Sequence, residues 1–259
     1  MKKVFMILGS SLVAALMVMA CSKPAQNNNG KTPSDEQNPG GEEPGGDETD
    51  EAIIKIDGDF SDWKALGDIP AAYLPDGCTK VSVLVLKATS DDKNLYVYFE
   101  QELEEGQSVS PFDLFLNTDG DDETGASTYL WDSAGWDYLI ESEIGLLGSA
   151  TSVRDMDDMA IYKFIGPDGA DGWDDPDDTD DNYAPYQERL DDTGFATSAG
   201  VVEGGIAKVE LAVERAPFGK MASSIKIGIL LYEGDSWQDN GVLPQAENGG
   251  LETMLEVKL

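Results

Sequence analysis

Short runs rich in valine, isoleucine, leucine and tyrosine, separated by turn residues, fill the chain from Ala52 to Leu259. No segment keeps a helical period over many residues, and the best short helix candidate is RAPFGKMAS, residues 215–223. Many short strands joined by short turns are typical of two packed antiparallel sheets. The sequence therefore predicts an all-β, jelly-roll-like antiparallel β-sandwich as a single domain, residues 52–259. Its strands are expected in IIKID (53–57), KVSVLVLKAT (80–89), NLYVYFEQE (94–102), PFDLFLN (111–117), DYLIESEI (137–144), MAIYKFIG (159–166), IAKVELAVE (206–214), SIKIGILLYEG (224–234) and LETMLEVKL (251–259).

The run LYVYFE, residues 95–100, has the alternation expected of a strand, in which successive side chains point to opposite faces. Leu95, Val97 and Phe99 share one face, and Tyr96, Tyr98 and Glu100 share the other. Turn residues bound the runs, as in SDDKN (90–94) and GPDG (166–169).

Residues 22–51 have a different composition from the rest of the chain. They are rich in Pro, Gly, Asn and acidic residues and contain no aromatic or β-branched aliphatic residue. Such a segment cannot bury enough apolar surface to offset the entropy lost on ordering. We therefore expect residues 21–51 to form a lipidated cysteine followed by a disordered, acidic linker.

The first twenty residues read as a secretory signal peptide, with Lys2 and Lys3 before an apolar run that ends at Cys21. The tetrapeptide VMAC, residues 18–21, resembles the lipobox of bacterial lipoproteins. That resemblance implies cleavage before Cys21 and lipidation of Cys21, so that the membrane is reached only through a lipid anchor. Ser22 favours the outer membrane of a Gram-negative bacterium by analogy with lipoprotein sorting, at the cell surface or the periplasmic face.

The charge of the chain excludes several functions. Removing Lys2 and Lys3 from 17 basic residues leaves 15 against 51 acidic ones, a formal net charge of −36. A protein with this negative charge repels phosphate groups, and nucleic acid is therefore not expected as a partner.

The absence of histidine removes the commonest zinc ligand, which leaves hard, oxygen-seeking cations such as calcium. Cys78, the other cysteine, is expected to be a small buried or half-buried residue beside a turn. A nucleophilic role for Cys78 is not expected, because the chain has no histidine to activate it.

The segment that opens the domain, IDGDFSDW (56–63), contains a turn at Asp57–Gly58 followed by Trp63. We interpret Trp63 as a buried anchor rather than a sugar-stacking residue, because its neighbours Ile54, Ile56 and Leu66 are apolar.

Three motifs occur in a characteristic order: IDGDFSDW, then VSVLVLKATSDDKNLYVYFE (81–100), then FDLFLNTDGDDETG (112–125). Together with GWDYLIE (135–141), they resemble family 9 carbohydrate-binding modules and the related DOMON-like β-sandwiches. The resemblance implies a β-sandwich that binds an oligosaccharide or polysaccharide without catalysis. The haem-binding members of the group fit less well, because the chain has no histidine.

The loop FLNTDGDDETG (115–125) carries oxygen-bearing side chains at every second position, and Gly120 permits a tight turn. Several such oxygens can converge on one calcium ion. The loop is not an EF-hand, because its glycine and its final acidic residue are misplaced. A solvated hairpin loop is the other interpretation. The expected calcium ligands are Asn117, Asp119, Asp121 and Glu123, with Asp113 as a further ligand if it faces inward.

A second acidic segment, residues 166–192, has eleven acidic residues and one basic residue. We interpret it as a disordered loop, since like charges this dense repel, with a second calcium site as the alternative. Trp173, Tyr183 and Tyr186 lie in it and are candidates for stacking on a sugar.

Trp237 is followed by Gln238, Asp239 and Asn240. An aromatic ring beside amide groups suits a pyranose, which offers an apolar face and a ring of hydroxyls. The predicted sugar-binding residues here are Trp237, Gln238 and Asn240, and a buried Trp237 is the alternative. Of Trp131 and Trp136, we expect one buried and one exposed.

No enzyme motif such as GxSxG, HExxH or a P-loop is present, so the chain is not predicted to be an enzyme. An alternative to sugar binding is a structural or adhesive surface lipoprotein that binds a protein partner.

Overall fold

The computed structural model describes residues 52–80, 82–105, 107, 109–132, 135–142, 152–153, 159–172, 186–191, 195–233 and 238–259. The chain divides after Thr49, and residues 50–259 form one unit. The predicted signal peptide, Cys21 and the linker lie outside the described residues. None of the described helices is long and apolar enough to cross a membrane.

The described part of the chain is built almost wholly of strands, with one short α-helix and two 3₁₀ turns. The elements, in chain order, are α1 (Ser61–Ala65), β1 (Ala71–Tyr73), β2 (Val83–Ser90), β3 (Asn94–Glu102), β4 (Phe112–Asn117), β5 (Tyr138–Ser142), β6 (Ser152–Val153), β7 (Met159–Phe164), β8 (Gln187–Asp191), β9 (Ala196–Glu203), β10 (Ile206–Glu214), η1 (Ala216–Phe218), β11 (Ser224–Tyr232), β12 (Asp239–Leu243), η3 (Glu247–Gly249) and β13 (Leu255–Lys258).

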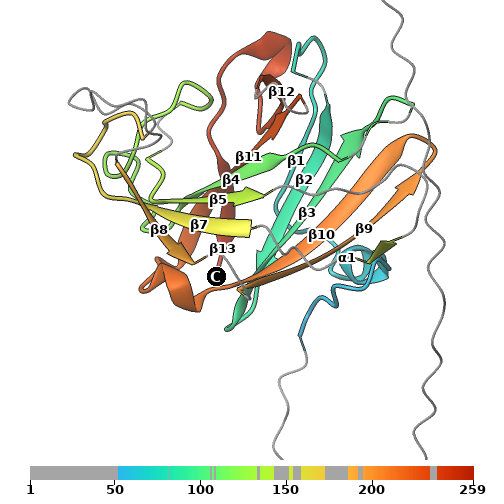
Figure 1. The fold of residues 1–259 in the computed structure, drawn as a ribbon, viewed down its shortest axis with the longest axis horizontal. Coiled ribbons are helices and arrows are strands. Elements are labelled where there is room, and N and C mark those ends of the chain that lie inside the picture. Colours follow the sequence, from blue (N-terminus) through green and yellow to red (C-terminus); the bar gives the residue numbers. More distant parts are fainter. Residues whose placement is uncertain are drawn as a thin grey trace, which may run out of the picture. The chain divides into compact units, whose positions relative to one another are not determined.

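The strands form two antiparallel sheets that face each other (Figure 1). One sheet has the order β1-β2-β3-β10-β9-β6. The other has the order β12-β11-β4-β5-β7-β8, with β13 also pairing with β11. The predicted antiparallel β-sandwich is therefore confirmed.

Most of the predicted strands are present, and two of them, Asn94–Glu102 and Ile206–Glu214, have the predicted bounds. The strand expected at residues 53–57 is wrong, because this segment bends and packs across the outside of a sheet. Residues 215–223 hold only the 3₁₀ turn η1, and the α-helix lies instead at Ser61–Ala65. Residues 187–191, expected to be part of a disordered loop, form β8. The sequence prediction also missed β1, β6, β9 and β12.

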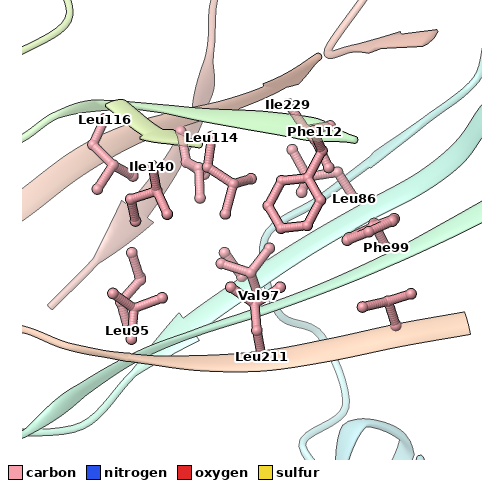
Figure 2. Packing of buried hydrophobic residues seen from close by; sticks show 14 of the residues in the cluster. Leu86, Leu95, Val97, Phe99, Phe112, Leu114, Leu116, Ile140, Leu211 and Ile229 are labelled. Carbon is pink, nitrogen blue, oxygen red and sulfur yellow. The ribbon is translucent and has the colours of Figure 1, made fainter. Parts of the chain in front are cut away.

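The central core lies between the sheets (Figure 2). Leu95, Val97 and Phe99 of β3 point into it, as the alternation predicts, and meet Phe112 and Leu114 of β4. All of these side chains are fully buried. Tyr96 and Tyr98 point to the other face of β3, also as predicted, but that face is buried as well. Strand β4 is likewise buried at all six positions. Both sheets therefore have covered outer faces.

The segment from Ile54 to Ile69, including α1, covers the outer face of the six-stranded sheet (Figure 1). Trp63 is 3% exposed and packs 5.5 Å from the ring of Tyr98, so the predicted buried anchor is confirmed. The carboxylate of Glu210 on β10 fixes this segment. It accepts the indole N–H of Trp63 at 2.9 Å and the backbone N–H groups of Asp57 and Gly58 at 3.0 and 2.8 Å. The IDGDFSDW motif is therefore a structural unit that binds one buried carboxylate.

Glu210→Ala is expected to destabilise residues 50–259 by about 1–3 kcal/mol, mainly because the buried indole N–H of Trp63 loses its acceptor, whereas water can reach the part-buried N–H groups of Asp57 and Gly58. Urea unfolding followed by tryptophan fluorescence measures this difference. Glu214→Ala, at the exposed end of the same strand, is the matched control and is expected to cost less than about 1 kcal/mol. Equal losses for the two variants would contradict the anchoring role of Glu210.

Candidate functional site

Hydrogen bonds within the acidic loop after β4 hold its shape. Asn117 Oδ1 accepts the N–H of Gly120 at 2.7 Å. Asp119 Oδ1 accepts the N–H of Asp121 at 2.8 Å, and Asp121 Oδ1 accepts the N–H of Glu123 at 3.0 Å. Short polar side chains close many turns in this way. Three of the four predicted calcium ligands thus use an oxygen to cap the loop backbone.

Groups of three or more carboxylate or cysteine side chains placed to hold a metal ion are absent from the described residues. Asp113 does not join the loop. It lies four residues before Asn117 on β4, a distance of roughly 13 Å along a strand. Calcium binding by Asn117, Asp119, Asp121 and Glu123 stays a prediction of the sequence.

Two contacts from neighbouring strands position the same loop. Asp137 Oδ2, just before β5, accepts the N–H and the hydroxyl of Thr118 at 2.7 and 2.8 Å. Burial raises the pKa of Asp137, and the hydrogen bonds from Thr118 oppose that rise. Lys226 on β11 forms an ion pair with Asp122. The loop is therefore attached to the end of the seven-stranded sheet.

Trp131 and Trp136 lie in the layer that covers the outer face of the seven-stranded sheet. Their exposed fractions are 2% and 0%, so the expectation that one of them is exposed is wrong. Both rings pack edge-on against Phe115 of β4, at 5.2 and 5.7 Å. Gly228 of β11 makes room for Trp131, because a Cβ atom there would lie 2.5 Å from the indole ring. These tryptophans are core residues and cannot stack on a ligand.

Tyr129, in the same covering segment, is exposed. Its exposed fraction is 65%, the highest among the large apolar and aromatic side chains of the described residues. Its hydroxyl donates to Asp239 Oδ2 at 2.9 Å, and Lys80 Nζ lies 2.5 Å from the same oxygen. Lys80 Nζ also lies 5.5 Å from the centroid of the Tyr129 ring. The ring is thus held in place by its polar end while its apolar body faces solvent.

The hydroxyl of Tyr129 remains protonated at neutral pH. Partial burial, the hydrogen bond to Asp239 and the charges of Asp239 and Asp171 raise its pKa to about 12. Tyr129 therefore acts as a donor to Asp239. We name Tyr129, Lys80 and Asp239 the tyrosine cluster.

The predicted sugar-binding residues Gln238 and Asn240 flank Asp239 at the start of β12. Gln238 is exposed and Asn240 is half-buried. The backbone oxygen of Asn240 accepts the N–H of Ser82, which ties this end of β12 to the start of β2. Two predicted ligand-binding residues are therefore the chain neighbours of Asp239, which contacts the exposed tyrosine.

Tyr186 is not near these residues. It lies before β8, partly exposed, with its ring 6.3 Å from that of Phe164. Strands β8 and β12 are at opposite edges of the seven-stranded sheet, roughly 24 Å apart at about 4.8 Å per strand. One sugar ring cannot contact both edges. Trp237, Trp173 and Tyr183 lie outside the described residues and stay predictions.

Sequence reasoning missed Tyr129 and Lys80 as site residues. Tyr129 lies one residue away from a buried leucine and two away from Trp131, and no local pattern separates the exposed ring from the buried one. Lys80 meets Asp239 across 159 residues of sequence. Their proximity comes from the pairing of β11 with β12 and from the closeness of β12 to β2.

A buried carboxyl lies behind the tyrosine cluster. Asp113 of β4 is fully buried and accepts the hydroxyl of Tyr232 of β11 at 2.5 Å. Its other oxygen, Oδ1, has no hydrogen-bond partner among the described residues. Burial raises the pKa of Asp113 to about 8, the hydrogen bond from Tyr232 opposes this, and the charges of Glu141 on β5 and Asp239 on β12 add to it. Burial therefore favours the protonated form of Asp113.

No protein-family model matches the chain, and the comparison with curated proteins gives no match. Two similar solved structures are family 9 carbohydrate-binding modules from Caldicellulosiruptor kristjanssonii, one in complex with cellotriose and one with glucose. The identities are 13% and 14%, and 80% of this chain is covered in each case, with 89% and 91% of those chains. The TM-scores are 0.35 and 0.36.

These solved structures belong to the family that the sequence motifs resemble.

Asp113 is expected to make stability depend on pH. Its unfolded-state pKa is near 4 and its folded-state pKa is about 8, so the stabilisation from its proton is complete below pH 4 and is lost as pH rises toward 8. The slope reaches about 1.4 kcal/mol per pH unit at most. Asp113→Asn should flatten this part of the stability curve, measured by urea unfolding at several pH values.

Asp76→Asn, at an exposed position, is the control and should leave the slope unchanged. A slope in Asp113→Asn equal to that of the unaltered protein would show that Asp113 is ionised throughout this range.

Proposed function

We propose that this protein is a non-catalytic lipoprotein of the cell envelope, attached through Cys21, whose β-sandwich binds carbohydrate. The observation that carries the proposal is the exposed ring of Tyr129, held by Asp239 and Lys80 beside Gln238 and Asn240. The order of the three sequence motifs, which resembles family 9 carbohydrate-binding modules, supports the same conclusion.

The tyrosine cluster and the two residues that flank Asp239 have the two chemical features that a sugar requires. The ring of Tyr129 offers a flat apolar surface for the face of a pyranose. The amides of Gln238 and Asn240 offer both donors and acceptors for its hydroxyl groups. Asp239 accepts from Tyr129 and pairs with Lys80, so the ring is oriented before a ligand arrives, which lowers the entropic cost of binding.

Residues 50–259 contain all three buried clusters of the described chain, so this part can be used in solution without the anchor. A panel of oligosaccharides, beginning with cellotriose and glucose, is expected to include one that raises its melting temperature, because a ligand that binds only the native state stabilises it.

Tyr129→Ala is expected to weaken binding of that oligosaccharide at least about tenfold, measured by isothermal titration calorimetry, since the main apolar contact is lost. Tyr73→Ala is the matched control: Tyr73 is 62% exposed but lies on β1 of the other sheet, and its loss should leave the affinity unchanged.

Two outcomes would contradict the proposal. A panel in which no saccharide shifts the melting temperature would favour the protein-binding alternative, especially if a pull-down yields a specific partner. Equal effects of Tyr129→Ala and Tyr73→Ala would place the binding surface elsewhere.

We further propose calcium for the acidic loop, on the chemistry of its donors alone. Asn117, Asp119, Asp121 and Glu123 supply oxygen ligands of the type that calcium prefers. Binding requires oxygens that now cap backbone N–H groups to turn toward the ion.

Calcium is therefore expected to raise the melting temperature of residues 50–259, and EDTA to reverse the rise. Asp121→Asn should reduce the shift, whereas Asp76→Asn should leave it unchanged. A melting temperature that responds to neither calcium nor EDTA would contradict the proposal, and this measurement does not depend on any sugar.

A further inference from the structure

Lys80 supplies the positive charge of the tyrosine cluster, and an acidic side chain neutralises it. Lys80 Nζ lies 2.5 Å from Asp239 Oδ2, and both side chains are partly shielded from solvent, with exposed fractions of 35% and 17%. Lys80 also faces the ring of Tyr129. Its ammonium group is thus committed to a carboxylate and an aromatic ring within the protein.

Two acidic side chains act on Tyr129 as well. Asp239 accepts its hydroxyl, and the charges of Asp239 and Asp171 add to the burial that raises the pKa of that hydroxyl. Glu141 lies on the strand next to Asp113, behind the cluster. Asp171 is exposed on the loop after β7, where its backbone pairs with that of Ser127 in the segment leading to Tyr129. The charged groups that these interactions place at Tyr129 are therefore two carboxylates and one paired lysine.

We propose that this site discriminates by charge: it takes neutral or amino saccharides and rejects uronic acids. The proposal rests on the proposed function and names its ligand class. A carboxylate on the sugar would be repelled by Asp171, and it could pair with Lys80 only by displacing Asp239 from the ion pair. A neutral sugar requires no such displacement, and a protonated amine is attracted by Asp171.

The test compares three saccharides on one backbone with residues 50–259: cellotriose, its counterpart with glucosamine units, and its counterpart oxidised to uronic acids at C6. Titration calorimetry at low salt is expected to give affinities that fall in the order amino, neutral, uronic. The differences should shrink at high salt, because screening weakens interactions between exposed charges.

Asp239→Asn is the decisive variant. It removes one negative charge and frees Lys80, while the asparagine oxygen can still accept the hydroxyl of Tyr129. The ratio of uronic to neutral affinity should rise roughly threefold or more, the effect of one unit charge at about 6 Å in water. The matched control is Glu203→Gln, which removes an equal charge from a surface pair with Lys208 on the other sheet. For Glu203→Gln, the ratio of uronic to neutral affinity should not change.

The outcomes separate this inference from the proposed function. Binding of the uronic trisaccharide as tightly as cellotriose, or an unchanged ratio in Asp239→Asn, would overturn the charge selection while leaving sugar binding intact. Absence of binding by all three trisaccharides, together with a blank oligosaccharide panel, would overturn the proposed function itself.

Discussion

Both faces of both sheets must be covered, because the central strands carry apolar side chains on both sides. Strand β4 is buried at every position, and β3 presents aliphatic side chains inward and Tyr96 and Tyr98 outward. A simple sandwich buries only the inner faces. The chain therefore has two further layers, one on the outer face of each sheet, and segments outside the strands contribute to both.

The two outer layers are held in different ways. On the six-stranded sheet, one buried carboxylate, Glu210, accepts three N–H groups of the opening segment and so fixes Trp63 over Tyr98. On the seven-stranded sheet, Trp131 and Trp136 pack against Phe115, and a glycine in β11 gives one indole its space. Because the covering layers use the described tryptophans, the strongly exposed rings among the described residues are tyrosines, Tyr129 and Tyr73. The position of the candidate site therefore depends on the segment that covers the outer face of the seven-stranded sheet.

Charge acts on two scales in this protein. The chain as a whole is strongly acidic, with a formal net charge of −34 at pH 7. At the tyrosine cluster, Asp239 neutralises Lys80. The charges of Asp239 and Asp171 also act on the hydroxyl of Tyr129. Deeper in the sheet, burial raises the pKa of Asp113, and the charges of Glu141 and Asp239 add to that rise. The proposed selection for neutral and amino saccharides depends on this local charge balance rather than on the net charge of the chain.

The sequence by itself determined the class of fold, the alternation in β3, the bounds of β3 and β10 and the burial of Trp63, because these depend on local periodicity and on apolar neighbours in the chain. Only the tertiary structure decided that Trp131 and Trp136 are both buried, that residues 53–57 cover a sheet instead of joining one, and that Asp113 faces Tyr232. It also decided that Lys80 and Asp239, 159 residues apart, hold the same tyrosine. The physical reason is that these contacts depend on which strands become neighbours, and strand order is set by packing over the whole domain rather than by any short segment.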